Sequence, residues 1–186
     1  MMPSPIPHPL AFPAVEGPLF ALDEEMLRIG HEGARLSPRR RIILPLHRTQ
    51  DSLVQRMLNF MQPGTYARPH LHPRPGAAEA VLVLRGAVDF FRFDAQGTVL
   101  DRVELRPGGA GLVDIEARVW HTFATLAPDT VVLEVKMGPY DAKLDKVFPE
   151  WAPDEGSPES GPWMERLLAS TPVTRAAVPA PVGLGV

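Results

Sequence analysis

Eight short β-rich runs follow one another between residues 42 and 136, and they constrain the fold more than any other feature. Each run is rich in aliphatic, Thr or aromatic residues, and Gly, Pro or Asp residues separate it from the next. No helical pattern lies between the runs, as a parallel sheet would require. The chain is therefore predicted to be all-β, an antiparallel sandwich or small barrel. The runs are IILPLH (42–47), LVQRMLNFM (53–61), AVLVLRG (80–86), VDFFRF (88–93), TVLDRVEL (98–105), GLVDI (111–115), WHTFATL (120–126) and TVVLEVK (130–136).

Composition excludes several classes of function. The 186 residues suffice for one well-formed core, and a net charge of −3 gives no basic surface for nucleic acid. No apolar run approaches the roughly 20 residues that span a bilayer, and the proline-rich N-terminus does not resemble a signal peptide, so we expect a cytoplasmic protein without a membrane partner. The chain has no Cys, so any metal must be held by nitrogen and oxygen atoms.

The ends of the chain differ from its centre. Repeated prolines predict an extended arm over residues 1–20. A short helical lead-in follows over 21–37, with Asp23 as its N-cap and Ser37-Pro38 as its end, and the β domain spans 38–156. In the C-terminal extension, 157–186, we expect one or two helical turns over 164–169 after a loop that includes Trp163, and then a partly disordered tail.

The segment GTYARPHLHPRPGAAEAVLVLRG, residues 64–86, carries the pattern most suggestive of chemistry. His70 and His72 are two residues apart, so in a strand they present two imidazoles on one face. Glu79 follows a proline-rich turn and would return beside them, and His121 would add a third imidazole from a distant strand. Three imidazoles and one carboxylate suit one divalent transition metal, Fe, Mn, Zn, Ni or Co. Taken singly, each histidine is more often an exposed loop residue or a satisfied core residue.

Further polar residues are candidates for a pocket above such a metal. We expect Arg41, His47, Arg56, Tyr66 and Arg68 to bind substrate, since guanidinium groups suit carboxylate and phosphate. Strand parity places Tyr66 and Arg68 on the face of the two histidines, so both are also catalytic candidates. Lys136 is a third, as an acid or base whose pKa burial would lower. The alternatives are ion pairs with surface carboxylates for the arginines, a structural role for His47 and a solvated strand end for Lys136.

An ordered set of segments resembles the WbuC family of cupin-fold metalloproteins. Residues 64–86 resemble the first cupin motif, and His121 resembles the histidine of the second. The resemblance implies a double-stranded β-helix, the cupin jelly roll, over 38–156, with a metal held inside the barrel by His70, His72, Glu79 and His121. The other matching segments are SPRRR (37–41), His47, VQRML (54–58), VLRG (83–86), FDAQG (93–97), WHTF (120–123), EVKMGPYD (134–141) and WAPDEG (151–156).

The same resemblance suggests a function. We expect a mononuclear metal-binding cupin that acts on a small polar molecule, sugar-like or acidic, in an isomerase- or epimerase-type step of bacterial surface-polysaccharide metabolism. One alternative is an Fe(II)-dependent dioxygenase, which the same ligands would permit. Another is a non-catalytic module that binds metal and ligand without turnover. A homodimer is also expected, because the proline-rich arm could cover the sheet edge of a neighbouring copy.

Overall fold

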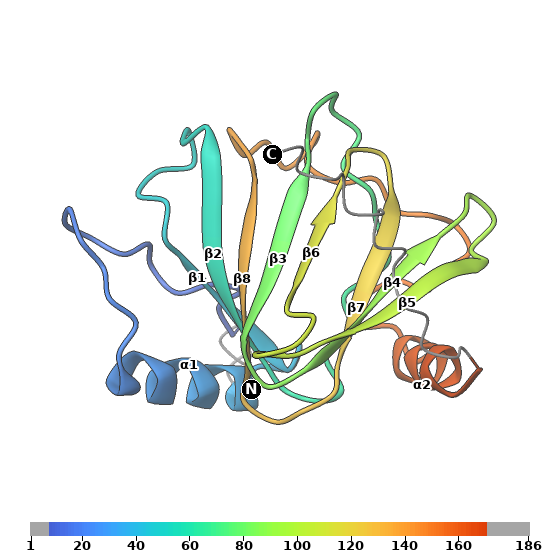
Figure 1. Ribbon diagram of the computed structural model, residues 1–186, viewed down its shortest axis with the longest axis horizontal. Coiled ribbons are helices and arrows are strands. Elements are labelled where there is room, and N and C mark those ends of the chain that lie inside the picture. Colours follow the sequence, from blue (N-terminus) through green and yellow to red (C-terminus); the bar gives the residue numbers. More distant parts are fainter. Residues whose placement is uncertain (1–7, 171–186) are drawn as a thin grey trace, which may run out of the picture.

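Two antiparallel β-sheets form the centre of the molecule (Figure 1). The computed structural model describes residues 8–170. The larger sheet has the strand order β1-β2-β8-β3-β6, and the smaller has the order β5-β4-β7. The prediction of an all-β jelly roll with a short N-terminal helix is confirmed. The strands are β1 (Arg41–Pro45), β2 (Val54–Met61), β3 (Glu79–Arg85), β4 (Val88–Phe93), β5 (Val99–Leu105), β6 (Leu112–Ile115), β7 (Trp120–Thr125) and β8 (Thr130–Met137).

The main core lies between the two sheets at one end of the barrel. Alternating side chains of both sheets point inward there, as the period of a half-buried strand requires. At the other end the inward positions of β2, β3 and β8 carry polar side chains, including Asn59, Glu79, Glu134 and Lys136, all of them buried. The barrel is therefore apolar at one end and polar at the other. The core residues are Met61, Val81, Val83, Val88, Phe90, Leu105, Ile115 and Val132.

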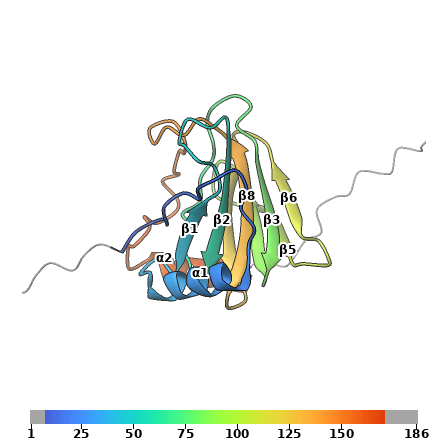
Figure 2. The same ribbon diagram turned by 90° about the vertical axis from the view of Figure 1, so that its left-hand side faces the viewer.

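Helix α1 (Glu24–Leu36) packs on the outer face of β1 and β2, at the bottom of the molecule in Figures 1 and 2. Asp23 caps it by accepting a hydrogen bond of 2.8 Å from the Met26 amide. Gly30 faces the aromatic ring of Phe60, and a Cβ at position 30 would overlap that ring. This glycine, which weakens the helix as a sequence pattern, thus allows α1 to lie close to the sheet.

The described part of the N-terminal arm runs beside β1 of its own chain. The Phe12 amide donates to the Ile43 carbonyl at 2.8 Å, and the Val15 amide donates to the Pro45 carbonyl at 3.1 Å. These bonds cover the β1 edge of the larger sheet. In Figure 2 the segment passes in front of β1 and β2. Homodimer formation through this arm stays a prediction.

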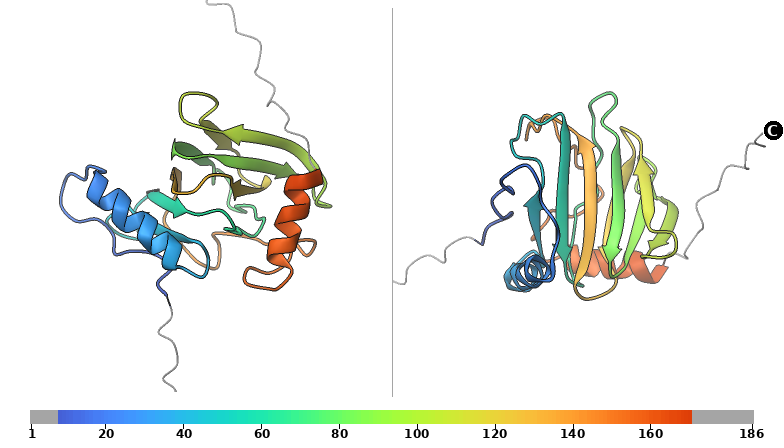
Figure 3. Two further views of the ribbon diagram at one scale, coloured as in Figure 1. Left: turned by 90° about the horizontal axis from the view of Figure 1, so that it is seen from below. Right: turned by 60° about the vertical axis from the view of Figure 1, so that its left-hand side comes forward.

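Helix α2 (Ser160–Ser170) covers part of the smaller sheet and begins earlier than predicted (Figure 3). Trp163, expected in a loop, lies in its first turn, where its amide donates to the Glu159 carbonyl at 2.9 Å. Pro162 is tolerated near the start of a helix because that position needs no amide donor. Met164 and Leu167 are buried against Tyr66, Phe91 and Phe93. The mobile tail predicted beyond this helix lies outside the described residues.

Neither α1 nor α2, the helices of the described residues, is long and apolar enough to cross a membrane.

Candidate metal centre

The two neighbouring histidines lie between two segments that are distant in sequence. His70 pairs with His121 of β7, and each backbone amide donates to the other residue's carbonyl, at 3.0 and 2.9 Å. Leu71 pairs in the same way with Val147 on the other side, at 3.1 and 3.0 Å. The segment that carries His70 and His72 is therefore fixed on both edges. The pairing of Leu71 with Val147 also places residues 145–148 beside the site.

Four side chains converge between the sheets at the polar end of the barrel. Glu79 is the first residue of β3, which places its carboxylate beside the three imidazoles. One ligand atom from each of His70, His72, Glu79 and His121 lies within 4.8 Å of the others, and all four residues are buried, with exposed fractions of 2–5%. The predicted set of residues is thus brought together as a group that can hold a metal ion.

Backbone carbonyls fix the protonation of all three imidazoles. The Nδ1 atoms of His70, His72 and His121 lie 2.9, 2.6 and 2.9 Å from the carbonyl oxygens of Arg68, Asp145 and Val119. A carbonyl oxygen can only accept, so each Nδ1 carries a proton and donates it. In the neutral imidazole each Nε2 is then left with its lone pair directed at the common centre, the arrangement found in metal-ligating histidines.

The surroundings of the Nε2 atoms suit a cation at the centre. Those of His70 and His121 are buried without a hydrogen-bond partner among the described residues. That of His72 lies 2.6 Å from Glu79 Oε2, and that of His121 lies 3.6 Å from the same oxygen. A lone pair and a carboxylate oxygen at such a distance repel unless a proton or metal ion lies between them. A divalent metal would satisfy all of these atoms at once.

Electrostatics favour the metal-binding forms of His70 and Glu79. Burial, the ammonium of Lys146 and the neighbouring His121 hold the pKa of His70 well below its usual range. For Glu79, burial acts to raise the pKa, but the neighbouring imidazoles of His121, His72 and His70 outweigh it and keep this pKa well below its ordinary value. At neutral pH the site therefore offers a neutral His70 and an ionised carboxylate, the forms that bind metal.

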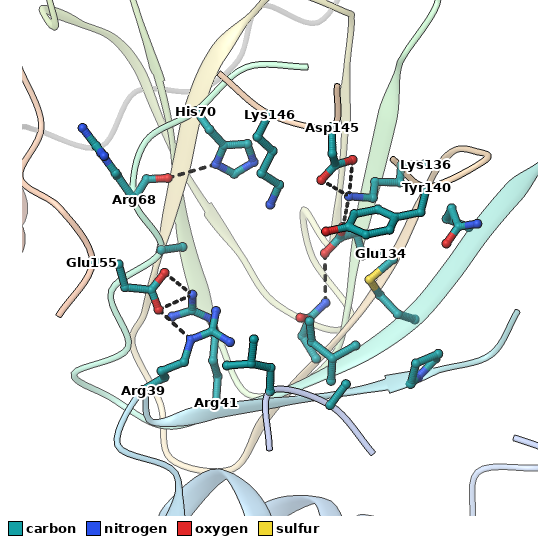
Figure 4. A pocket seen from close by; sticks show the side chains of 18 of the residues that line it. Arg39, Arg41, Arg68, His70, Glu134, Lys136, Tyr140, Asp145, Lys146 and Glu155 are labelled. Carbon is teal, nitrogen blue, oxygen red and sulfur yellow. Dashed lines mark hydrogen bonds and ion pairs between the residues drawn. The ribbon is translucent and has the colours of Figure 1, made fainter. Parts of the chain in front are cut away.

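A cavity of about 410 Å³ opens beside the centre, and His70 forms part of its wall (Figure 4). This volume is within the usual range for small-molecule sites. Apolar side chains such as Met57, Phe123 and Phe148 line part of it. Five cationic and three anionic side chains also line it, and these are Arg39, Arg41, Arg68, Lys136 and Lys146, with Glu134, Asp145 and Glu155.

Most of these charges are neutralised by partners within the protein. Glu155 accepts from Arg39 at 2.6 Å and from Arg41 at 2.7 and 2.8 Å. Arg68 pairs with the Asp154 carboxylate and also donates to the Pro149 carbonyl at 2.9 Å. The arginines thus hold the loop 149–155 against the barrel.

Lys136, expected to have its pKa lowered by burial, behaves in the opposite way. Its ammonium donates to both carboxylate oxygens of Asp145 at 3.0 Å and lies 3.8 Å from Glu134. Burial lowers the pKa of Lys136, but the charges of Glu134, Asp145 and Glu79 outweigh it, and the net pKa is raised. Lys136 therefore stays protonated at neutral pH and suits the role of a hydrogen-bond donor rather than a base.

Lys146 is the lysine of the cavity whose pKa is lowered. Burial and the nearby ammonium of Lys136 cause this shift, against the opposing charges of Glu134, Glu79 and Asp145. Within residues 8–170 its ammonium has no hydrogen bond or ion pair. Figure 4 shows its side chain beside His70, directed into the cavity.

The structure brings some of the predicted pocket residues to the cavity and not others. Arg41, His47, Arg68 and Lys136 line it, and the Nδ1 of His47 lies 2.8 Å from the Arg56 carbonyl. The side chain of Arg56 is exposed and does not line the cavity.

Tyr66 also lies away from the cavity. Its hydroxyl donates to the Pro153 carbonyl at 2.8 Å, and its ring packs against Trp163 of α2. Burial raises its pKa to about 12. The parity argument for Tyr66 fails because residues 65–69 are not a strand, so the two-residue alternation does not extend back from His70.

Several cavity residues were missed by sequence reasoning. Asp145, Lys146 and Phe148 come from a segment without regular periodicity, and nothing in their spacing indicates that they face a site. Glu155 lies in the WAPDEG segment of the family resemblance, and no site role was predicted for it. The cationic cluster of Arg39 and Arg41 was the available signal for Glu155, since buried guanidinium groups require a carboxylate partner.

One protein-family model matches part of the chain. A family model described as a domain of unknown function, DUF6016, matches residues 22–105, which is less than half of the 186 residues. No curated protein matches. The resemblance to the WbuC family is not confirmed by these comparisons and stays a prediction.

Among solved structures, the chain is similar to an oxalate oxidase in complex with the substrate analogue glycolate, with 16% identity over 61% of this chain and 57% of that one, at a TM-score of 0.47. It is also similar to KdgF from Halomonas sp., with 18% identity over 58% of this chain and 87% of that one, at a TM-score of 0.45. For oxalate decarboxylase from Bacillus subtilis the identity is 14%, over 71% of this chain and 29% of that one, at a TM-score of 0.45. The chain thus spans just over half of the oxalate oxidase and less than a third of the decarboxylase.

Proposed function

We propose that this chain is a mononuclear metal-binding cupin that binds a small polar molecule in the cavity beside the metal and acts on it. One observation carries the proposal. Three buried imidazoles are fixed by backbone carbonyls so that their Nε2 lone pairs meet at Glu79, and one of these imidazoles forms part of the cavity wall. A ligand in the cavity would therefore lie next to the metal.

His70, His72, Glu79 and His121 would hold the ion, and this oxygen and nitrogen donor set suits a divalent first-row metal. When bound, the metal would supply Lewis-acid chemistry by polarising a carbonyl or hydroxyl oxygen of the ligand. Lys136 is held by Asp145 at the cavity wall and would donate a hydrogen bond to a ligand oxygen. The apolar side chains of Phe123 and Phe148 would exclude water from part of the cavity.

The reaction that we propose is an isomerase- or epimerase-type step on a sugar-like or acidic molecule. The resemblance to the WbuC family supports this choice, and it also suggests a place in bacterial surface-polysaccharide metabolism. Polarisation of a carbonyl oxygen assists removal of the neighbouring proton, which is the chemistry that such a step needs. Fe(II)-dependent dioxygenation and ligand binding without turnover are the competing functions.

The test is the metal content of protein purified without a histidine tag, measured by mass spectrometry. We expect about one transition metal per chain in the wild type and a loss of more than about 90% in His72→Ala and His121→Ala, because each variant removes a ligand atom. His47→Ala is the matched control: it removes a buried imidazole from the cavity wall and should retain the metal. Wild-type protein that stays metal-free after anaerobic reloading would contradict the proposal.

The identity of the metal directs the second measurement. If the metal is iron, oxygen uptake is measured with candidate acids and sugars. If it is zinc or manganese, the exchange of protons for deuterium in the same compounds is measured in deuterated water. Oxygen uptake would replace the isomerase assignment by dioxygenation. Tight ligand binding with neither signal would identify a binding module.

A further inference from the structure

The cavity is cationic, and all but one of its cations already have a partner. The lining side chains carry five positive and three negative charges, which leaves a net charge of about +2 before any metal is bound. Arg39 and Arg41 bind Glu155, and Arg68 binds Asp154. Lys136 binds Asp145. In each pair the group that satisfies the cation is a carboxylate of the protein.

Lys146 is the exception within the described chain. Its ammonium has no partner within hydrogen-bond or ion-pair distance there, and its side chain is directed into the cavity beside His70 (Figure 4). Its backbone is held in place by the pairing of Val147 with Leu71, next to two of the metal ligands. An ordered, partly buried ammonium without a counter-charge is costly unless a ligand supplies one.

We propose that Lys146 selects the substrate class of this site by binding a carboxylate of a small acid whose other oxygen atoms lie at the metal. This inference rests on the proposed function and narrows its ligand from any small polar molecule to an organic acid. Lys146 is then a specificity-determining residue. The acidic groups nearest to it, Glu134, Asp145 and Glu79, are each engaged with another residue, so none of them replaces the ligand.

A carboxylate fits this arrangement better than a phosphate group. Phosphate recognition in proteins usually relies on the paired donors of arginine or on helix N-termini. Here the guanidinium groups of the cavity are bound to Glu155 and Asp154, and Lys146 offers a single point charge. One ammonium matches the single negative charge of one carboxylate.

The experiment compares acids with their neutral amides on Co(II)-loaded protein, with affinities from calorimetry and ligation followed in the visible spectrum. The probes are glycolate and malonate, with glycolamide and malonamide as neutral counterparts and inorganic phosphate as a second anion. Lys146→Met removes the charge and nearly preserves the length, whereas Lys146→Arg keeps the charge. Lys143→Met is the matched control, because Lys143 is exposed on the same segment and does not line the cavity.

We expect Lys146→Met to bind at least one of the two acids with an affinity tenfold or more below that of the wild type. Its affinity for the amides should stay within about twofold of the wild type. Lys146→Arg should bind that acid within about threefold of the wild type, and Lys143→Met within about twofold. Equal affinity of wild type and Lys146→Met for both acids, equal losses for acids and amides, or no binding of either acid to the wild type would each overturn the inference. Lys146-dependent binding of phosphate alone would overturn the carboxylate assignment.

The result separates this inference from the proposed function. Protein that binds Co(II) but whose affinity for acids does not depend on Lys146 would retain the metal function and lose the inference. Protein that fails to bind any metal would lose the proposed function, and the same titrations would then be made on the metal-free variants. If acid binding to the metal-free protein still depends on Lys146, this would support the role of Lys146 in the cavity. If it does not depend on Lys146, that role would be overturned.

Discussion

Two buried histidine environments in this molecule look alike at first and differ in what surrounds them. His70, His72 and His121 lie between the sheets, and His31 lies on α1 against the outer face of β2. All four residues are at most 6% exposed. The Nε2 atoms of His70, His121 and His31 have no hydrogen-bond partner among the described residues.

The difference lies in the second ring nitrogen. In the three inner histidines a backbone carbonyl fixes Nδ1, and the Nε2 lone pairs point to one centre. In His31 neither nitrogen has a hydrogen bond, the ring edge packs on Phe60 at 5.7 Å between centroids, and the Asp129 carboxylate lies 3.9 Å away. Burial with an unsatisfied nitrogen therefore does not identify a metal ligand. A fixed Nδ1 proton and a shared centre are the features that single out the three inner histidines as candidate ligands.

Removal of the metal should have the largest effect on the free energy of unfolding, and this effect should depend on the three inner histidines and not on His31. A metal that binds only the folded state stabilises it by about 2.7 to 4.1 kcal/mol at 100 to 1,000 times its Kd. We expect chelation to lower the free energy of unfolding of metal-loaded wild type by an amount of this order, as measured by urea denaturation with and without EDTA.

Matched substitutions make the test specific. His121→Gln should abolish the response to EDTA, whereas His31→Gln should respond as the wild type does, because only the first removes a ligand. A His31→Gln variant that no longer responds to EDTA would show that the two histidine environments are coupled. It would then remove the distinction between them.

A substitution at Gly30 should have a smaller effect and should be confined to the α1 side. A Cβ at position 30 would overlap the Phe60 ring, and such overpacking costs about 1 to 3 kcal/mol, only partly offset by the better helix propensity of alanine. We expect Gly30→Ala to lower the free energy of unfolding by the difference, up to about 2 kcal/mol, without loss of metal. Gly161→Ala in α2 is the control, because a Cβ there meets nothing within 4 Å and should leave stability equal or higher. Unchanged stability in Gly30→Ala would contradict the packing described for α1.

The fold was predictable because its signals are local and repeated. Each of the eight β-rich runs became a strand, since turn residues such as Gly86 and Gly97 end the strands where the backbone needs positive φ. The start of α2 was missed because prolines and glycines around residues 156–162 indicate a loop, while the apolar contacts of Trp163, Met164 and Leu167 with the smaller sheet stabilise the helix. Such contacts between distant segments are absent from a local pattern.

The grouping of the candidate metal ligands was predictable for a related reason, and most of the cavity was not. His70, His72 and Glu79 lie in one short segment whose spacing places them together. His121 was expected to add a third imidazole from a distant strand, and the family resemblance supports that expectation. Lys146 reaches the site only because Val147 pairs with Leu71, a contact between segments 76 residues apart that no spacing rule describes. The parity argument that placed Tyr66 beside the histidines fails for a different reason, because it assumes a strand over residues that do not form one.

The smallest predicted effect is a pH dependence that belongs to His31. Burial lowers the pKa of His31 below 6.5, although Asp129 acts against this shift. At pH values between the lowered pKa of the folded state and the ordinary pKa, the unfolded chain binds more protons at this residue. The contribution of His31 therefore makes the protein less stable as the pH falls from 7.5 to 5.5.

His31→Gln removes that titration. We therefore expect the free energy of unfolding to fall less over this interval in His31→Gln than in wild type, both measured without metal. The other ionisable groups are the same in both proteins and cancel in the comparison. The carboxyl of Asp129 has a lowered pKa and stays ionised throughout, so it does not contribute. Equal losses in the two proteins would mean that His31 is solvated enough to titrate normally, and it would then no longer serve as the buried, metal-free counterpart of the three inner histidines.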